Sequence, residues 1–242
     1  MLSLKGINAG YGKLHVLFDI DAVLKEKEIT ILIGPNGSGK STLLKTIMGL
    51  TQLYTGKVIF EGVEMQGIPP HEVTKQGIAY LPQVNNVFSE LKIRENLIMA
   101  GYTLGKEEAQ NRSIDVLDDF PVLKKYLDRK AGTLSGGERQ MLAMAMALMR
   151  RPKMMLFDEP IGSLAPKKAK EVLSEILRLR DTYEITVLLA EQNARRALEQ
   201  GDKALLLVSG RVMYNDTAQK LLKHPELGKV YLGIKKAWHL QL

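Results

Sequence analysis

The sequence predicts an α/β protein with a mainly parallel central sheet, an N-terminal antiparallel β layer and a helical insertion. Apolar and polar residues alternate near the N-terminus, as in half-buried strands, and four continuous apolar runs are typical of strands covered on both faces. Residues 84–132 contain no such run and have helical spacing instead. We therefore expect a single domain over residues 1–242.

The antiparallel layer is predicted from the first part of the chain. Apolar residues stand at every second position in Val16, Phe18, Ile20, Ala22 and Leu24. Leu2, Leu4 and the segment 57–60 have a similar pattern, and glycines separate these segments. Period-two alternation indicates strands with one buried face, which suits an antiparallel sheet.

The parallel sheet is predicted from the apolar runs Thr30–Ile33, Met154–Phe157, Thr186–Leu189 and Ala204–Val208. Helical spacing after Pro166 indicates a crossover helix, because proline suits a first helical turn. Within the insertion we expect helices over Glu90–Tyr102 and Lys106–Leu127. We also expect a helical tail over residues 217–242.

The composition excludes several classes of protein. The chain has 242 residues, of which 45% are hydrophobic, so it can form a core. It lacks cysteine, which excludes disulfides and thiolate metal sites, and its histidines lack ligand spacing, so we expect no metal site made by protein groups alone. The longest apolar run, Met141–Met149, has nine residues, whereas a membrane-spanning helix needs about 20. We expect no such helix and, without a secretory signal at the start, a cytoplasmic location.

The net charge does not select a partner. Lysine and arginine number 34 against 27 acidic residues, which leaves +7. Such an excess is compatible with nucleic acid, with an anionic membrane face, with bound phosphates or with an ordinary solvated surface. The short motifs carry the remaining information.

A phosphate-binding loop is the strongest motif. Residues Gly34 to Ser41 match G-x-x-x-x-G-K-[ST] between the buried strand at 30–33 and the start of a helix at 42–45. Such a loop points backbone N–H groups inward, and the helix N-terminus adds partial positive charge, so polyphosphate is the expected ligand. Lys40 would contact the β and γ phosphates, and Ser41 would bind Mg²⁺. The predicted nucleotide-binding residues are Gly34, Pro35, Asn36, Gly37, Ser38, Gly39, Lys40, Ser41 and Thr42, in a P-loop NTPase core. The alternative is an ordinary glycine turn.

Two carboxylates follow the run at 154–157. Asp158 and Glu159 stand at the carboxyl end of a buried strand, where α/β sheets bind ligands. Asp158 could bind Mg²⁺ through water, and Glu159 could orient or deprotonate the water that attacks the γ-phosphate. By itself this pair also fits a helix cap.

The segment Leu134–Gln140, with the sequence Leu-Ser-Gly-Gly-Glu-Arg-Gln, resembles the signature of ATP-binding cassette (ABC) ATPases. Ser135, Gly136 and Gly137 begin a helix, so their donors form a second site for an anion. The resemblance implies the ABC ATPase fold and a head-to-tail dimer, in which each loop at 34–41 faces the partner's 134–140. Whether two copies pair or this chain pairs with a paralogous ATPase subunit stays open.

Other positions acquire roles from the same resemblance. Tyr11 resembles the aromatic residue that stacks on adenine, and Gln83 resembles the glutamine that contacts Mg²⁺ and water. Gln192 stands where most of the family has a histidine that senses the γ-phosphate; it can donate a hydrogen bond but cannot carry a proton. The predicted catalytic residues are thus Glu159, Gln192 and Lys40, and Ala165 replaces an aspartate that many relatives have.

The segments 191–198, 163–166 and 230–233 are similar to the ATPase subunit of bacterial and archaeal branched-chain amino acid importers. This resemblance implies ATP and Mg²⁺ as cofactors, transmembrane permease subunits as partners, an indirect extracytoplasmic receptor, and a peripheral position on the cytoplasmic face of the membrane. It also implies that a coupling helix of the permease docks near Val84, Val87, Phe88 and Leu91.

Three alternatives remain open at this point. Related ATPase subunits serve amides, urea or lipopolysaccharide. A soluble ABC ATPase could act on nucleic acid or ribosomes, but such proteins usually have two cassettes or a long coiled-coil insertion, so we expect no nucleic-acid partner. A nucleotide-sensing module without hydrolysis is the third alternative, suggested by Gln192 and Ala165.

Overall fold

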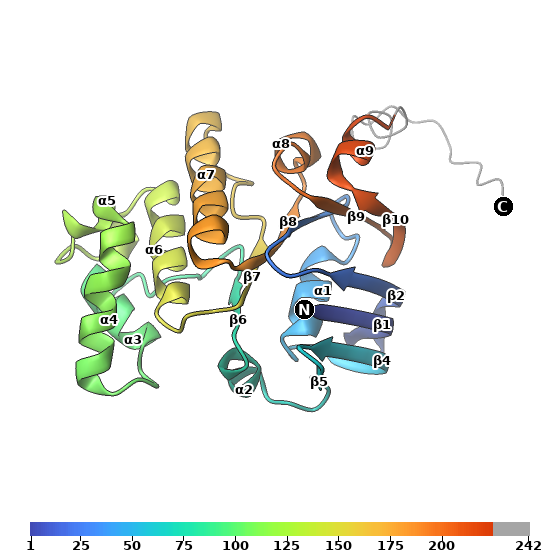
Figure 1. Cartoon of the computed structure of the whole chain (residues 1–242), viewed down its shortest axis with the longest axis horizontal. Helices are drawn as coiled ribbons and strands as arrows, with labels where there is room; N and C mark the ends of the chain where they lie inside the picture. The colour runs from blue at the N-terminus through green and yellow to red at the C-terminus, as the bar shows by residue number, and fades with distance from the viewer. Residues whose placement is uncertain (225–242) are drawn as a thin grey trace.

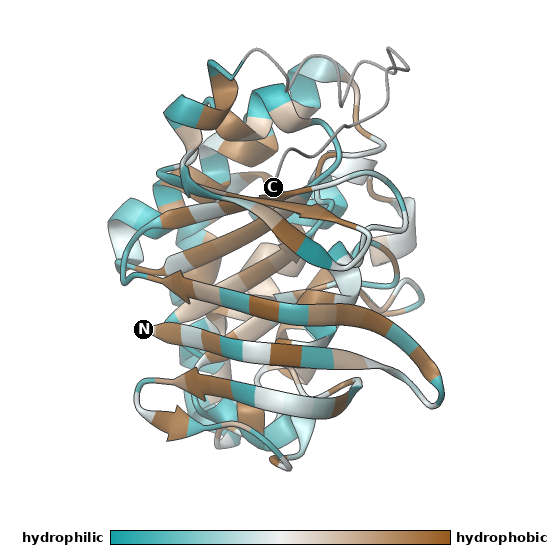
Figure 2. Cartoon of the chain, turned by 90° about the vertical axis from the view of Figure 1, so that its right-hand side faces the viewer, coloured by the Kyte–Doolittle hydropathy of each residue, from teal (hydrophilic) through white to brown (hydrophobic). Residues whose placement is uncertain are grey.

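The computed structural model describes residues 1–224 and contains two sheets. The first has the order β2-β1-β4-β5 and is antiparallel. Its strands are β1 (Leu2–Tyr11), β2 (Leu14–Leu24), β4 (Gln52–Phe60) and β5 (Val63–Glu64). This sheet is the predicted N-terminal antiparallel layer, and its strands alternate between hydrophobic and hydrophilic residues in Figure 2.

The second sheet has six strands in the order β10-β9-β3-β8-β7-β6. Strand β3 is parallel to β8 and β9, β7 is parallel to β6 and β8, and only β10 is antiparallel to its neighbour. The strands are β3 (Ile29–Ile33), β6 (Ile78–Leu81), β7 (Met154–Asp158), β8 (Thr186–Glu191), β9 (Lys203–Val208) and β10 (Arg211–Thr217). The mainly parallel sheet is therefore confirmed, and all four apolar runs lie in it.

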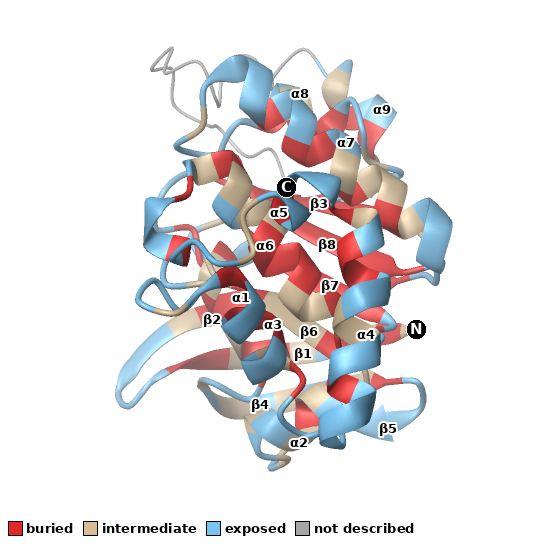
Figure 3. Ribbon diagram, turned by 90° about the vertical axis from the view of Figure 1, so that its left-hand side faces the viewer, coloured by how far each residue is buried: buried red, intermediate tan, exposed pale blue. Residues whose placement is uncertain are grey.

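Each face of the parallel sheet is covered by a different layer. On β3, Leu32 packs with the antiparallel sheet and with α1 (Lys40–Ile47), whereas Ile31 and Ile33 pack with α6 (Gly136–Leu148) and α7 (Pro166–Tyr183). Strands β3, β7 and β8 are buried along their whole length, as Figure 3 shows. Burial on both faces explains why these strands consist of continuous apolar runs.

The helical insertion lies at one side of the molecule, at the left of Figure 1. The helical insertion contains α3 (Ile93–Ala100), α4 (Lys106–Asp119), α5 (Pro121–Lys124) and a 3-10 turn, 131–133. The remaining helices are α2 (Pro70–Lys75), α8 (Ala194–Leu198) and α9 (Ala218–Leu222). No helix within residues 1–224 has the length and apolar character needed to cross a membrane.

Several predicted boundaries were wrong. The helix expected over 106–127 is interrupted at Phe120, because a residue before proline avoids the helical conformation and Pro121 has no N–H to donate. The helix expected from Glu90 begins at Ile93, where the Glu95 carboxylate accepts a hydrogen bond from the N–H of Lys92 at the helix start. Strands β6 and β10 were not predicted. The helical tail expected over 217–242 lies mostly outside the described residues, where only α9 belongs to it.

Candidate nucleotide-binding site

The loop between β3 and α1 is curled in a way that requires glycine. Gly37 and Gly39 have left-handed backbone angles, with φ of +76° and +105°. A Cβ atom on Gly34 would lie 2.3 Å from the carbonyl oxygen of Leu207, so no larger residue fits there without movement of the main chain. The N–H of Ser38 donates to the carbonyl of Pro35 at 3.1 Å and closes the curl. The loop therefore has the compact shape that phosphate binding needs.

Lys40 lies inside this loop and is almost fully buried, with 4% of its side chain exposed. Its Nζ donates to the carbonyl oxygens of Gly34 at 2.9 Å and Pro35 at 3.3 Å. It also forms an ion pair with Oε1 of Glu159 at 3.2 Å. A buried ammonium needs such partners, and this arrangement places its charge beside the curled backbone.

Asp158 ends β7 and joins the loop to the parallel sheet. The Ser41 hydroxyl donates to Oδ1 of Asp158 at 2.8 Å, and the Tyr80 hydroxyl donates to Oδ2 at 3.0 Å. Burial raises the pKa of Asp158, while the hydrogen bonds from Ser41 and Tyr80 lower it. Burial and the neighbouring Asp158 carboxyl raise the pKa of Tyr80, so its hydroxyl stays protonated and donates. Tyr80 was missed as a site residue, because the short apolar run at 78–81, which forms the strand β6 that presents it, was not interpreted as a strand.

Glu159 follows in a strained conformation, with φ of +50°. Left-handed backbone costs a residue with a Cβ about 1–2 kcal/mol. The Gln83 amide donates to Oε2 of Glu159 at 3.1 Å, and the N–H of Glu159 donates to the carbonyl of Ala190 on β8 at 2.9 Å. Five predicted site residues are thus connected by direct contacts: Lys40, Ser41, Gln83, Asp158 and Glu159.

The donor set fits a magnesium nucleotide. The Ser41 hydroxyl, an Asp158 carboxylate oxygen and the Gln83 amide oxygen are hard oxygen ligands, the type that Mg²⁺ prefers. In the glycine loop next to them, Gly37 has no side chain and borders open space, so a phosphate group can approach the backbone there closely. These groups would hold the ion and the polyphosphate.

Three other predicted residues or segments do not join this cluster directly. Tyr11 ends β1 with 43% of the residue exposed, and Gln192 is exposed directly after β8. Ser135 caps α6, where its Oγ donates to Glu138 at 2.7 Å, and Gly136 and Gly137 begin the helix. Because α1 and α6 pack on opposite faces of the parallel sheet, the 34–41 loop and the 134–140 segment belong to different layers of one chain.

Glu191 is a buried acidic residue that the sequence analysis did not assign to the site. It ends β8 with 0% exposure, and its Oε1 accepts a hydrogen bond from the N–H of Ile161 at 3.0 Å. Its Oε2 has no hydrogen-bond partner in the part of the chain that is described. Burial raises the pKa of Glu191 to about 7. The available signal was a charged residue at the end of an apolar segment, since Glu191 follows the run at 186–189 after Ala190.

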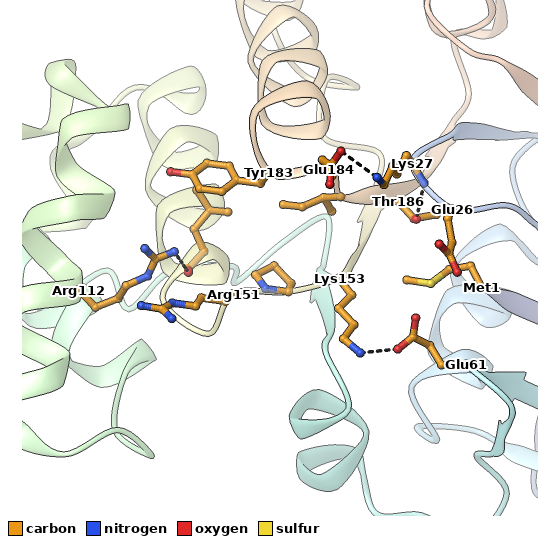
Figure 4. A pocket seen from close by; sticks show the side chains of 13 residues that line it. Met1, Glu26, Lys27, Glu61, Arg112, Arg151, Lys153, Tyr183, Glu184 and Thr186 are labelled. Carbon is orange, nitrogen blue, oxygen red and sulfur yellow. Dashed lines mark hydrogen bonds and ion pairs between the residues drawn. The ribbon is translucent and has the colours of Figure 1, made fainter.

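A separate cavity of about 460 Å³ lies away from the loop (Figure 4). Its lining includes Lys27, Lys153 and Thr186, which precede or begin the parallel strands, so it lies at their amino ends. Lys27 pairs with Glu184 at 2.8 Å, and Lys153 pairs with Glu61. The cavity contains none of the predicted site residues, and the cluster around Lys40 lies instead at the carboxyl ends of β3 and β7.

The expected docking area for a coupling helix is only partly exposed. Val84 and Phe88 are exposed at 66% and 50%, whereas Val87 packs against the core and Leu91 is half-buried. The four methionines of Met141–Met149 lie in the core or pack against it, as their adaptable side chains suggest.

The chain is similar to proteins of one family. The family model described as ABC transporter matches residues 17–162, which is more than half of the sequence, so the chain belongs to the ABC transporter family. The predicted family is therefore confirmed.

Particular relatives extend this similarity over nearly the whole chain. It is 54% identical to the probable branched-chain amino acid transport ATP-binding protein LivF of Archaeoglobus fulgidus, over 97% of this chain and 99% of that protein. It is 42% identical to the high-affinity branched-chain amino acid transport ATP-binding protein BraG of Pseudomonas aeruginosa, over 96% of this chain and 100% of that protein. The ADP conformation of a solved ATP-binding cassette from an ABC transporter matches with a TM-score of 0.87 and 27% identity, over 96% of this chain and 98% of that one. The predicted ABC ATPase fold is confirmed by this match.

Proposed function

We propose that this chain is the ATP-hydrolysing subunit that powers membrane import of branched-chain amino acids. The observation that carries the proposal is the cluster around the glycine loop, in which Lys40 and Ser41 contact the acidic pair Glu159 and Asp158 directly. The chain is an ABC ATPase, and the names of LivF and BraG support branched-chain amino acids as the cargo.

Hydrolysis requires that the γ-phosphate and a water molecule are held in line while negative charge is neutralised. The inward N–H groups of the loop and the Lys40 ammonium bind the phosphate oxygens. Ser41, Asp158 and Gln83 would hold Mg²⁺, which supplies further charge neutralisation when it is bound. Tyr80 keeps Asp158 oriented through its hydrogen bond.

Glu159 orients the attacking water and accepts its proton. The Gln83 amide and the Lys40 ammonium each contact one oxygen of this carboxylate, which fixes its orientation. Gln192 would donate a hydrogen bond to the γ-phosphate, and Tyr11 would stack on adenine. An exposed tyrosine suits stacking, because its ring face is free for a base.

The second phosphate site is supplied by a partner cassette. Within one chain, Ser135 and the loop at 34–41 belong to layers on opposite faces of the parallel sheet. A head-to-tail dimer would place Ser135, Gly136 and Gly137 of one subunit against the nucleotide of the other. The partner is a second copy or a paralogous ATPase subunit.

The membrane partner is a permease. Val84 and Phe88 are exposed apolar side chains next to Gln83, and they suit a short helix of a transmembrane subunit. Contact there would link permease movement to the residue that orients Glu159. The chain would then lie peripherally on the cytoplasmic face of the membrane, and an extracytoplasmic receptor would act only through the permease.

Glu159→Gln tests the catalytic assignment. The amide cannot accept a proton, so we expect turnover to fall by about 10²- to 10⁴-fold, with ATP affinity retained and the dimer trapped in its ATP-bound form. Phosphate release and size-exclusion chromatography with Mg-ATP measure both effects. Glu171→Gln, an exposed acid on α7, is the matched control and should leave turnover unchanged. Unchanged turnover in Glu159→Gln would contradict the assignment.

The cargo is tested in liposomes that contain the assembled transporter. Labelled leucine should enter in an ATP-dependent manner, and Glu159→Gln should abolish entry. ATP-dependent transport of urea or an amide, with none of leucine, would overturn the proposed cargo and leave the ATPase assignment intact.

A further inference from the structure

The turn after the catalytic carboxylate is held by the end of β8. Between residues 159 and 162 the chain has three N–H groups, since Pro160 has none. Glu159 N–H donates to the Ala190 carbonyl at 2.9 Å, and Ile161 N–H donates to Oε1 of Glu191 at 3.0 Å. The third, Gly162 N–H, donates to the Glu159 carbonyl at 3.3 Å within the turn. Two of these three N–H groups therefore donate to the last two residues of the neighbouring strand β8.

This turn needs external support. Glu159 has a φ of +50°, a conformation that a residue with a Cβ keeps only when its surroundings impose it. Ile161 is 4% exposed, so its N–H would find no water in place of Glu191. The only side chain among the three acceptors is that of Glu191, so one substitution can remove this support without touching Glu159.

Glu191 is connected to two residues that are predicted to act at the γ-phosphate, Gln192 and Glu159. It is followed directly by Gln192, and its side chain crosses to the segment that follows Glu159. Glu191 itself is 0% exposed, so it does not contact a ligand from solvent. Its place in the fold suits a group that acts on the catalytic residue through the backbone.

We propose that Glu191 is a positioning residue for ATP hydrolysis: its Oε1 fixes the Ile161 N–H and thereby holds the Glu159 carboxylate at the attacking water. The inference rests on the proposed hydrolysis by Glu159. The hydrogen bond needs a carbonyl or carboxylate oxygen at the same distance from the main chain, and it does not need a negative charge.

Three substitutions test the proposal. Glu191→Ala removes the acceptor, and we expect kcat to fall by about 10- to 100-fold, because a displacement of about 1 Å can cost that much. The KM for ATP should change by less than about 3-fold, since the hydrogen bonds of Lys40 and Ser41 go to Gly34, Pro35 and Asp158 and not to Glu191. Glu191→Gln keeps an oxygen at the same position and should retain kcat within about 3-fold of the wild type. Glu191→Asp keeps the charge but is too short to reach Ile161, so its kcat should fall as in the alanine variant.

Asp202→Ala is the matched control. Asp202 also accepts a main-chain hydrogen bond, from the N–H of Ile29 at 2.8 Å, but at the amino end of β3, away from Glu159. We expect a lower melting temperature with unchanged kcat. Melting curves of all variants allow kcat to be expressed per folded molecule, and the aspartate variant decides the question if the alanine variant does not fold.

The outcomes separate this proposal from the proposed function. Wild-type kcat per folded molecule in both Glu191→Ala and Glu191→Asp would overturn the positioning role. Glu191→Gln with the same loss as Glu191→Ala would also overturn it, because the charge and not the hydrogen bond would then be responsible. In either case a large loss of kcat in Glu159→Gln would still support the proposed hydrolysis. A wild-type protein that releases no phosphate from Mg-ATP would overturn both the proposed hydrolysis and the positioning role of Glu191.

Discussion

Replacing Gly34 by alanine should weaken ATP binding for a purely steric reason. Gly34 does not have a left-handed φ, so alanine is compatible with its backbone angles. The added Cβ would lie 2.3 Å from the Leu207 carbonyl oxygen and 2.4 Å from Oγ of Ser38, whereas real contacts essentially never fall below 3.0 Å. The main chain of the loop must therefore move by about 0.7 Å away from β9, and its N–H groups move with it.

The size of the effect follows from the cost of overpacking. Forcing an extra carbon into a packed site costs about 1–3 kcal/mol, and each 1.4 kcal/mol is a factor of about ten in affinity. We expect ATP affinity to fall by about 5- to 150-fold. Isothermal titration calorimetry with Mg-ATP measures the affinity, and thermal melting without nucleotide shows how much of the cost falls on the folded protein itself.

Gly37→Ala is the matched comparison within the same loop. No atom of the described residues lies within 4 Å of a Cβ at Gly37, so only its φ of +76° opposes alanine, at about 1–2 kcal/mol. The expected loss of affinity is at most about 5- to 30-fold. An affinity in Gly34→Ala equal to that of the wild type, or a larger loss in Gly37→Ala than in Gly34→Ala, would refute the steric reasoning.

Two further predictions concern stability. Burial raises the pKa of Glu191 in the folded protein to about 7, above its ordinary value of 4.5, so this group stabilises the fold below about pH 4.5 and loses that contribution as the pH rises towards 7. We compare the free energy of unfolding of the wild type with that of Glu191→Gln, which has no titrating group at this position. This difference should be less favourable to the wild type at pH 8 than at pH 5. Urea unfolding at both pH values measures the difference, and a value that does not change with pH would contradict the prediction. Arg178→Ala removes an ion pair with Asp119 at 2.9 Å that joins α7 to α4. Because 37% of the arginine side chain is exposed, we expect the free energy of unfolding to fall by about 1 kcal/mol and Tm to fall by about 2–4 °C. The control is Arg195→Ala, at an arginine whose side chain is 84% exposed, and it should change Tm by less than about 1 °C. Equal shifts of Tm in the two variants would contradict a stabilising role for the ion pair between Arg178 and Asp119.

The contacts of the proposed catalytic site differ in how far the sequence predicts them. The phosphate loop is contiguous, and its glycines and its flanking strand and helix can be read from adjacent residues. The contact of Tyr80 with Asp158 joins residues 78 positions apart, and it depends on β6 lying next to β7. Strand β6 is only four residues long, with buried Ile78 and Leu81 at its ends and two half-buried residues between them, so its short pattern was not interpreted as a strand.

The helical insertion is an intermediate case. Its helical spacing was predicted correctly, since amphipathic periodicity is a local property. Its boundaries were not, because the interruption at Phe120 and the late start at Ile93 depend on Pro121 and on the contact between Lys92 and Glu95. Both signals are present in the sequence, but they are weaker than the periodicity that surrounds them.

The sequence by itself determined the fold class, the phosphate loop, the acidic pair and the family, because each depends on residues that are neighbours along the chain. Only the tertiary structure decided that Ser135 and the 34–41 loop belong to opposite faces of the parallel sheet, and that Glu191 supports the turn at Glu159. The strand order β3-β8-β7 brings the end of β8 beside the end of β7, and the hydrogen bond from Ile161 to Glu191 then joins residues 30 positions apart. Apolar periodicity reports which faces are buried, but it contains no information on which buried strands become neighbours.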